Sequence, residues 1–370
     1  MKRICFVTAA RSEYGVLRWL MKDVAADKDF CLQLVVTGGH LLRQQGHTID
    51  AIRADGFSID AVVDARLDVS SPEAVAASMG RMGEGFAPVL ARLRPDLLVV
   101  LGDRYELLPL CSTAFVMRIP IAHISGGDVT EGAIDDGVRN AVTMLATYHF
   151  PGTEDAARNI ARMRGSGEHV WTVGEPGLDA FRRMPLMARG ELAAELGLDA
   201  GQSWCLLTYH AETRQDLGYN LAAAEACLAA LEGQPGLQSV LTYANADFGG
   251  EQINALLEAK AAASPERFKA IPSLGQLRYL SFMRQAALIV GNSSSGIIEA
   301  PFLGIPVVNV GGRQRGRHLC GNIVQCGTSP AEVSEAVGRA LAGPVDAGDA
   351  SYWGDGTAAE RIMEVLRTCR

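Results

Sequence analysis

Residues 286–301 read A-A-L-I-V-G-N-S-S-S-G-I-I-E-A-P, and this stretch decides the fold more than any other. Its apolar start, 286–290, predicts a buried strand, and Ile297–Ala300 can open a helix. A strand, a turn of small residues and a helix N-terminus together form an anion site. The first N–H groups of a helix have no internal partners, and the helix dipole favours negative charge there.

The side chains of this turn indicate which anion it would hold. Ser293, Ser294 and Ser295 add hydroxyl donors, and Gly296 lets the backbone come close to a ligand. Glu299 lies about one turn into the helix. Because its carboxylate would repel a phosphate, we expect it to accept hydrogen bonds from ribose hydroxyls. The expected ligand is a nucleoside diphosphate, and a capped helix without a ligand is the alternative.

Length and composition indicate a globular enzyme with two domains. The chain has 370 residues, of which 48% are hydrophobic and 21% charged, and its net charge of −8 argues against a nucleic-acid partner. The start of the chain is strand-like and too short for a signal peptide, and no apolar run is long enough to span a membrane. We therefore expect a cytoplasmic protein.

Cysteines and histidines are scattered along the chain. The eight cysteines form no C-x-x-C pair, and the seven histidines form no H-x-x-x-H pattern. We therefore expect buried free thiols and no metal site.

Short apolar strands alternate with amphipathic helices in two series. The predicted strands are Ile4–Thr8, Leu32–Thr37, Leu97–Leu101, Pro120–Ile124, Tyr148–Pro151, Trp204–Thr208, Ser239–Thr242, Phe268–Ala270, Leu288–Val290 and Val307–Val310. The predicted helices are Tyr14–Ala26, Pro72–Arg94, Glu106–Arg118, Asp135–Thr147, Glu154–Arg162, Leu217–Glu232, Gln252–Ala262 and Leu277–Arg284. Strands separated by helices of this length imply parallel sheets with right-handed crossovers.

This alternation predicts an α/β fold of two Rossmann-like domains that face each other across a cleft. We place the first domain at 1–180 and the second at 181–353, with the segment 175–189 as the hinge. A last segment, 354–370, forms a helix that can pack back on the first domain, with a threonine or aspartate as its cap. Ligands of such sheets bind beyond the carboxyl ends of the strands.

Polar clusters follow several predicted strands of the first domain. Arg11 follows the first strand, and its guanidinium fork suits a phosphate or a carboxylate. Asp103 follows the strand that ends at Leu101, a common place for a catalytic acid or base and also for a helix N-cap. The glycine-rich connection after His123 holds four carboxylates, at Asp128, Glu131, Asp135 and Asp136. Two carboxylates in different environments are what general acid and base catalysis requires, although we expect one of the last two to cap a helix.

Three further clusters follow strands of the second domain. His210 can pair with a phosphate or donate to a leaving group, or it is an ordinary histidine at a strand end. Asn245 lies in a polar loop after the next strand. The loop that holds Arg313, Arg315 and Arg317 would offset the charge of a diphosphate. No G-x-G-x-x-G follows the first strand, so we expect no dinucleotide cofactor.

Seven motifs in this order carry a resemblance that covers essentially the whole chain. They are T-x-x-R-x-E-Y-G, L-G-D-R-Y-E, H-I-S-G-G-D with I-D-D-x-x-R, Y-H-A-E-T, N-A-D-x-G-G, G-N-S-S-S-G-I-I-E-A-P and G-R-Q-R-G-R. Together they resemble the UDP-N-acetylglucosamine 2-epimerases, and in particular the hydrolysing branch that serves sialic and legionaminic acid synthesis. The resemblance implies a GT-B-like pair of Rossmann domains with the nucleotide held mainly by the second, and a homodimer or homotetramer.

The reaction that the resemblance implies has two stages and needs no cofactor. Anti elimination removes the C2 proton and expels UDP, and water and a proton then add to the resulting glycal. By position, Asp103 and Asp135 match family carboxylates implicated in proton transfer, and His123 and Arg313 match residues near the cleft. The matches to nucleotide-contacting positions are Arg11, His210, Ser293, Ser294 and Glu299.

One position departs from the family pattern. Many members have glutamate in H-x-E-G-G, whereas this chain has Ser125, followed by a one-residue insertion. Serine cannot serve as that carboxylate, so we expect Asp128 or Glu131 to supply it from a shifted loop.

The leading hypothesis is a hydrolysing epimerase acting on UDP-N-acetylglucosamine or a UDP-2,4-diacetamido-2,4,6-trideoxyglucose. The alternatives are a non-hydrolysing epimerase, a GT-B glycosyltransferase and a non-catalytic nucleotide-sugar sensor. The density of carboxylates after His123 argues against the sensor, because binding alone would not need so much negative charge near a diphosphate.

Overall fold

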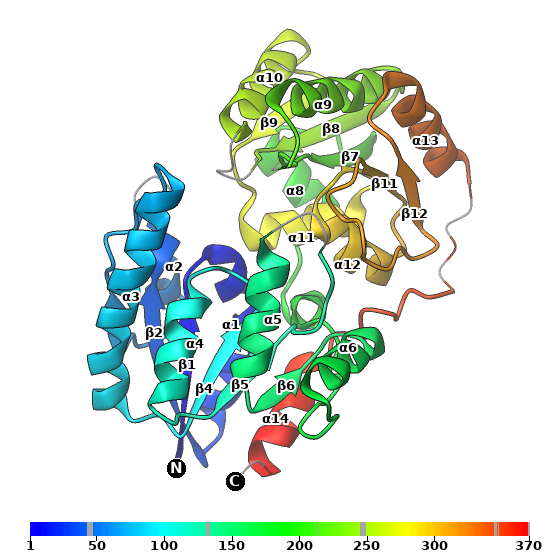
Figure 1. The fold of residues 1–370 in the computed structure, drawn as a ribbon. Helices are drawn as coiled ribbons and strands as arrows, with labels where there is room; N and C mark the ends of the chain where they lie inside the picture. The colour runs from blue at the N-terminus through cyan, green and yellow to red at the C-terminus, as the bar shows by residue number, and fades with distance from the viewer. Residues whose placement is uncertain are drawn as a thin grey trace. The chain divides into compact units, whose positions relative to one another are not determined.

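The computed structural model describes residues 1–42, 47–130, 134–212, 214–244, 249–343, 346 and 348–368. The chain forms two compact units (Figure 1). The first unit consists of Met1–Val129, Ile134–Ala180 and Gly354–Arg370, and the second consists mainly of Phe181–Trp353. Each unit is built around its own six-stranded parallel sheet.

The first unit has the strand order β3-β2-β1-β4-β5-β6, and every pair is parallel. Its strands are β1 (Lys2–Thr8), β2 (Phe30–Thr37), β3 (Ala61–Val63), β4 (Leu97–Leu101), β5 (Ile121–Ile124) and β6 (Tyr148–Phe150). Its helices are α1 (Arg11–Ala26), α2 (Ile49–Ala54), α3 (Pro72–Leu93), α4 (Leu107–Val116), α5 (Asp135–Leu145), α6 (Glu154–Arg164) and α14 (Ala358–Thr368), with the short 3-10 helices η1 (Gly38–Leu41) and η3 (Pro176–Leu178).

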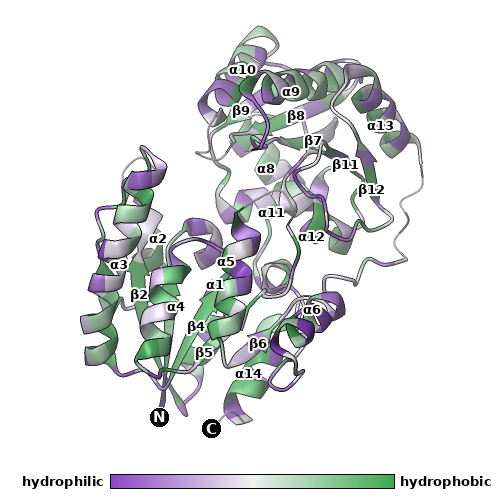
Figure 2. Cartoon of the chain, viewed as in Figure 1, coloured by the Kyte–Doolittle hydropathy of each residue, from purple (hydrophilic) through white to green (hydrophobic). Residues whose placement is uncertain are grey.

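Alternate residues of these strands pack against different helices. Ile4 and Phe6 belong to a core that includes residues of α1, α2 and α14. Cys5 and Val7 belong to a second core, which includes residues of α3, α4 and α5. Because successive side chains of a strand point to opposite faces, the sheet is covered by helices on both sides. Figure 2 shows the strands mostly green and the helices purple over part of their surface.

The second unit has the strand order β12-β11-β10-β7-β8-β9. Its strands are β7 (Ser203–Thr208), β8 (Leu237–Thr242), β9 (Phe268–Ile271), β10 (Leu288–Gly291), β11 (Val307–Val310) and β12 (Ile323–Cys326). Its helices are α8 (Arg189–Leu196), α9 (Leu217–Glu232), α10 (Gly250–Ala263), α11 (Gly275–Gln285), α12 (Ser294–Leu303) and α13 (Pro330–Ala342), and α7 (Asp179–Arg183) lies at the junction of the units. Read from the first strand of each unit, both sheets have the order 3-2-1-4-5-6 of a doubly wound fold.

The predicted fold class, two α/β units with parallel sheets, is confirmed. Outside the segment 175–189, six elements are additional to the prediction: β3, β12, η1, α2, α8 and α13. The segment 175–189, expected to be irregular, contains η3 and α7. The seven cysteines within the described residues are all free, as expected. No described helix combines the length and apolar character that crossing a membrane requires.

The strand order brings the polar clusters of the sequence together. At the switch point of a doubly wound sheet, the first and fourth strands are neighbours, and ligands bind beyond their carboxyl ends. In the first unit these strands are β1 and β4, which precede Arg11 and Asp103. In the second unit they are β7 and β10, which precede His210 and Ser293.

The C-terminal helix is fixed to the first unit by a cap from a distant part of the chain. The carboxylate of Asp179 is fully buried and accepts the N–H groups of Ala358 at 2.9 Å and Ala359 at 2.7 Å. Thr357 of the last segment lies directly before the helix, and its hydroxyl donates to Asp355. The acceptor for the first two N–H groups of α14 comes from outside that segment.

Replacing this cap should loosen α14. We expect Asp179→Ala to lower the free energy of unfolding by about 1–2 kcal/mol, because two N–H groups of the helix lose their acceptor. Urea unfolding measures the change, and hydrogen exchange should show faster exchange in α14. Glu364→Ala, on the exposed side of the same helix, is the matched control and should change stability by less than about 0.5 kcal/mol. Equal effects of the two variants would contradict the assigned cap.

Candidate active site

A buried arginine organises the carboxyl edge of the first sheet. Arg139, from α5, is 1% exposed and its guanidinium donates to the carboxylate of Asp103, which follows β4. It also donates to the backbone oxygen of Asp128 at 2.8 Å and to the carboxylate of Asp136 at 3.3 Å. The side chain of Asp103 remains 29% exposed. This edge therefore holds a carboxylate that is paired with a cation and still accessible.

His123 is buried directly behind this edge. Its Nε2 lies 2.8 Å from the backbone oxygen of Gly102, and its Nδ1 lies 3.2 Å from the hydroxyl of Thr143. Because a carbonyl oxygen can only accept, Nε2 carries the proton and Nδ1 accepts from the hydroxyl. Burial lowers the pKa of His123 to about 4, so the ring is neutral. The contact with Gly102 positions the backbone just before Asp103, and neither ring nitrogen is left for a substrate in this conformation.

Asp135 and Asp136 lie in the first turn of α5, after the N-cap residue Ile134. The expectation that one of them is the N-cap is therefore wrong. Arg11 is the first residue of α1, and its side chain is exposed. Glu131 lies outside the described residues.

Asp128, in the loop after β5, lines a small cavity. This cavity of about 170 Å³ is also lined by Asn140, Asn159 and Arg162, from α5 and α6. The loop is held by Arg139, which binds the backbone oxygen of Asp128, and by Asn159, which donates to the backbone oxygen of Gly127 at 3.0 Å.

Two buried glutamates, Glu13 and Glu106, and the half-buried Arg104 lie beside β1 and β4, and the sequence did not mark them as a site. Glu13 accepts the N–H groups of Ala9 at 2.7 Å and Ala10 at 3.1 Å. Arg104 donates to the buried Glu106 at 2.8 Å and lies 3.9 Å from Glu13. Burial raises the pKa of Glu13 to about 7, against the opposing charge of Arg104. Glu13 alone gives half of a capping pattern, because the N-cap residue Ala10 has no side-chain acceptor, and the approach of Arg104 depends on the strand order.

The second unit has the predicted strand, turn and helix at residues 286–301. Ser293 is the N-cap of α12, and its hydroxyl accepts the N–H of Ser295. Gly291 has a φ of 129°, and a Cβ there would lie 2.0 Å from the backbone oxygen of Thr208, so only glycine fits. At position 296 glycine is favoured by packing and not by the backbone angle. A Cβ there would lie 3.1 Å from Val307, so the small size of Gly296 lets α12 pack on β11.

Asn292 joins the loops that follow β7, β10 and β11. Its amide exchanges two hydrogen bonds of 2.8 Å with the backbone of His210. Its backbone oxygen accepts from Gln314 at 2.8 Å and from Arg313 at 3.1 Å. Glu212 adds a second link, because its carboxylate accepts the N–H of Gly312 at 2.9 Å. The sequence placed Asn292 inside the motif but gave no sign of this role.

The carboxyl edge of the second sheet combines arginine side chains with neutral hydrogen-bond donors. Burial, and then the charge of Arg313, lower the pKa of His210 to about 3, so its ring is neutral. Among the described residues, Nε and Nη1 of Arg317 are buried without a hydrogen-bond partner. A buried guanidinium with unsatisfied N–H groups is a binding element for an anion.

Glu299 and Tyr279 line the same helix N-terminus. Burial raises the pKa of Glu299 to about 7. The pKa of Tyr279 is also raised, mainly by burial, although hydrogen bonds to Ser295, Thr208 and Ser293 oppose the shift. Tyr279 comes from α11, and no sequence pattern marked it. Asn245 lies outside the described residues.

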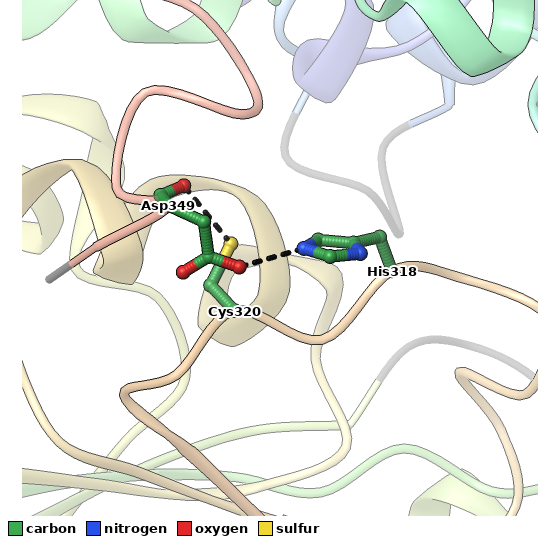
Figure 3. A group of neighbouring side chains, drawn as sticks. All are labelled: His318, Cys320 and Asp349. Atoms are coloured by element: carbon green, nitrogen blue, oxygen red, sulfur yellow. Dashed lines mark hydrogen bonds and ion pairs between the residues drawn. The ribbon is translucent and has the colours of Figure 1, made fainter. Parts of the chain in front are cut away.

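The arginine loop ends in a cluster with the segment before the C-terminal helix (Figure 3). Nε2 of His318 lies 2.7 Å from the carboxylate of Asp349, which also accepts the N–H of Gly321 at 3.0 Å. The thiol of Cys320 donates to the backbone oxygen of Asp349 at 3.6 Å. The three side chains offer metal-ligand atoms within 4.8 Å of one another, but their mutual contacts already engage the carboxylate. These contacts hold Asp349 against the loop that follows β11.

The fold and the motifs at both sheet edges define a nucleotide-sugar epimerase family. Residues 22–367 match the UDP-N-acetylglucosamine 2-epimerase family, and the chain belongs to it. Among its relatives is the GDP/UDP-N,N'-diacetylbacillosamine 2-epimerase (hydrolyzing) of Campylobacter jejuni, with 32% identity over 87% of this chain and 84% of that protein. The UDP-N,N'-diacetylbacillosamine 2-epimerase (hydrolyzing) of Legionella pneumophila is 31% identical over 100% of this chain and 96% of that protein.

Solved structures of such enzymes share the fold. The Neisseria meningitidis UDP-GlcNAc 2-epimerase bound to UDP-GlcNAc has a TM-score of 0.83 and 18% identity, over 99% of this chain and 100% of that chain. The Methanocaldococcus jannaschii UDP-GlcNAc 2-epimerase in complex with UDP-GlcNAc and UDP has a TM-score of 0.82 and 18% identity, with the same coverage. The predicted GT-B-like class of paired Rossmann units is thus the fold of this family.

Buried neutral histidines should make the protein sensitive to acid. Burial lowers the pKa of four of them to about 3 or 4: His40, His123, His149 and His210. Unfolding returns each ring to its ordinary pKa of about 6.5. The unfolded chain therefore binds more protons between pH 6.5 and 4, and the free energy of unfolding should fall as the pH is lowered through this window.

Two buried carboxyls oppose this trend. Glu13 and Glu299, with pKa values of about 7, stabilise the fold as the pH falls from 7 towards the ordinary value of about 4.5. The four histidines outnumber them, so we expect less stability at pH 5 than at pH 7 in urea unfolding. His123→Gln should reduce the difference, whereas His169→Gln, at an exposed position, should not. A difference unchanged by His123→Gln would contradict the assignment of a buried neutral ring.

Proposed function

We propose that this protein is a hydrolysing nucleotide-sugar 2-epimerase that releases UDP and a free sugar of manno configuration. The observation that carries the proposal is the division of chemistry between the two sheet edges. One edge presents carboxylates, and the other presents a helix N-terminus and the partly buried guanidinium group of Arg317. The names of the relatives at 31–32% identity support the hydrolysing branch.

The proposed reaction begins with an anti elimination. A carboxylate takes the proton from C2, the C–H electron pair forms the C1=C2 double bond, and the bond from C1 to the UDP oxygen breaks, so that UDP leaves with its electrons. Water then adds its oxygen to C1 of the glycal, and a second group gives a proton to C2 from the other face. The surplus proton of water and the proton held by the base both pass to solvent. The base and the acid must differ, because they act on opposite faces of C2.

Asp103 fits the role of the base in this scheme. Arg139 binds its carboxylate, and the side chain of Asp103 is accessible. Asp135 lies in the first turn of α5, one turn before Arg139, and is our candidate for the group through which the surplus proton of the attacking water passes to solvent. His123 acts through Gly102, as a positioning residue for the Asp103 loop.

The second unit would hold the leaving group. Its α12 N-terminus, with the hydroxyls of Ser293 and Ser294, suits the diphosphate, and Arg313 and Arg317 would offset the negative charge. Neutral His210 can donate a hydrogen bond to a phosphate oxygen without a charged form. Glu299 lies deeper in α12, where it can accept hydrogen bonds from ribose hydroxyls.

The substrate class is a UDP-linked 2-acetamido sugar. The names of two relatives support a 2,4-diacetamido-2,4,6-trideoxy sugar as the natural form, and UDP-N-acetylglucosamine is the simpler candidate. We also propose that the active form is a homodimer or homotetramer, which sedimentation equilibrium tests.

The first test follows the products. Purified protein incubated with each of these two UDP-sugars in heavy water should release UDP and give a manno-configured free sugar with deuterium at C2. Proton NMR measures both. A product that still carries UDP would identify a non-hydrolysing epimerase, and transfer without deuterium at C2 would identify a glycosyltransferase. No release of UDP from any such substrate would overturn the proposal.

The second test separates chemistry from binding. We expect Asp103→Asn and Asp135→Asn to lower kcat by about 10²–10⁴-fold, because each loses a proton-transfer group, with the Kd for UDP changed by less than about threefold. Asp136→Asn is the matched control, since it also removes a charge beside Arg139, and its loss should be much smaller. Steady-state kinetics and calorimetry with UDP measure the effects. A parallel loss of UDP affinity would show that the carboxylates hold structure instead.

A further inference from the structure

Glu175 brings a carboxylate to the same edge of the first sheet from a distant part of the chain. It precedes η3, and its side chain is almost completely buried, with the residue 8% exposed. Its Oε2 lies 3.1 Å from the hydroxyl of Ser125, the residue that follows β5. The separation along the chain is 50 residues, so no local pattern links these two positions.

The end of β6 is shaped around this carboxylate. A Cβ on Gly152 would lie 1.9 Å from Oε1 of Glu175, so the carboxylate lies against the bare backbone there. The backbone oxygen of Glu175 accepts the N–H of Leu178, and this bond begins η3. A Cβ on Gly354 would likewise lie 2.8 Å from the Cα of Gly174, so the backbone beside Glu175 is closely packed. The carboxylate is held in one place by its surroundings.

Ser125 is bent towards Glu175. Its φ of 56° is left-handed, a conformation that is uncommon for a residue other than glycine. Its N–H donates to the backbone oxygen of Phe150 at 3.0 Å, which ties the turn to β6. A serine hydroxyl is both a donor and an acceptor, so it can donate to an ionised Glu175 or accept from a protonated one. This contact is compatible with both protonation states of the carboxyl.

The other carboxylates considered for this position are placed differently. Asp128 lines the small cavity beside Asn140 and Arg162, and Glu131 lies outside the described residues. Among the described residues, the carboxylate that accepts a hydrogen bond from Ser125 is that of Glu175.

The strand order indicates how far Glu175 lies from Asp103, the proposed base. Asp103 follows β4, Ser125 follows β5, and Gly152, beside Glu175, follows β6. Neighbouring strands lie about 4.8 Å apart, so Asp103 and Glu175 are separated by roughly 10 Å along the edge. Two groups at this separation can address opposite faces of one sugar ring, as an inversion at C2 requires.

We propose that Glu175 is the acid that gives a proton to C2 of the glycal in the second stage, with Ser125 as its positioning residue. This step rests on the proposed function. The proton moves from the Glu175 carboxyl to C2, and the C1=C2 electron pair forms the new C–H bond. The oxygen of water bonds to C1, its surplus proton goes to solvent, and the Glu175 carboxylate regains a proton from solvent.

The central test is Glu175→Gln. Elimination does not need the acid, so the variant should still release UDP while the glycal accumulates. Formation of the free manno sugar should fall by about 10²-fold or more. Proton NMR resolves the vinylic proton of the glycal, and a coupled assay follows UDP. The Kd for UDP and the unfolding midpoint should stay close to those of the wild type.

Three further variants distinguish chemistry from structure. Glu154→Gln, at an exposed position near the same strand end, should retain wild-type kinetics. Ser125→Ala should reduce the second stage by less than Glu175→Gln does, because the carboxyl remains. The exchange Ser125→Glu with Glu175→Ser should recover part of the activity that Glu175→Ser alone loses, since it returns one carboxylate to the same place.

Two outcomes would overturn the assignment. Wild-type kinetics of Glu175→Gln would exclude Glu175 from the reaction. Loss of UDP release together with a lower unfolding midpoint or weaker UDP binding would show a structural role. The failure of the proposed function is separate, because it appears in the wild-type protein as an absence of UDP release.

Discussion

The buried guanidinium of Arg139 is the interaction on which the first unit's site depends. A charge that is almost completely removed from water is tolerated only if acceptors surround it, because desolvation would otherwise cost several kcal/mol. Asp103, Asp136 and the backbone of Asp128 supply these acceptors, and they come from three segments of the chain. The same contacts fix the loop after β4 to α5 and to the loop after β5. The same hydrogen bonds therefore position the carboxylates and satisfy the buried arginine.

In the second unit, the loops at the carboxyl edge of the sheet are held mainly by the neutral side chain and backbone of Asn292. Asn292 bonds the backbone of His210 through its side chain and accepts from Gln314 and Arg313 through its backbone. These bonds hold the three loops together, and Arg313 is the only charged residue among these partners. Since burial keeps His210 neutral, positive charge at this edge comes from guanidinium groups, which stay charged at any physiological pH. The positive charge of this edge therefore does not depend on His210, whereas Glu299, with a pKa of about 7, changes the net charge there near neutral pH.

The sequence predicted the alternation of strands and helices well, because buried parallel strands are short apolar runs that local composition reveals. The missed elements lacked this signal. β12 is only partly buried, and β3 has three residues. Motifs at strand ends also marked the loops that we propose carry function. Contacts such as Tyr279 to Ser295, Arg104 to Glu13 and Asp179 to Ala358 join segments that are distant in sequence, and they depend on strand order and helix packing.

The same reasoning explains how a chain can depart from its family at position 125 and keep a carboxylate in the site. All strands of a parallel sheet end at one edge, so loops from different parts of the sequence reach the same few ångströms of space. A carboxylate missing from the loop after β5 can be replaced by one that enters beside β6, provided that the backbone makes room and a hydroxyl binds it. Gly152 provides the room and Ser125 the hydroxyl. In our proposal Ser125 binds the relocated carboxylate, so that a substitution at position 125 or 175 has to be interpreted together with the other position.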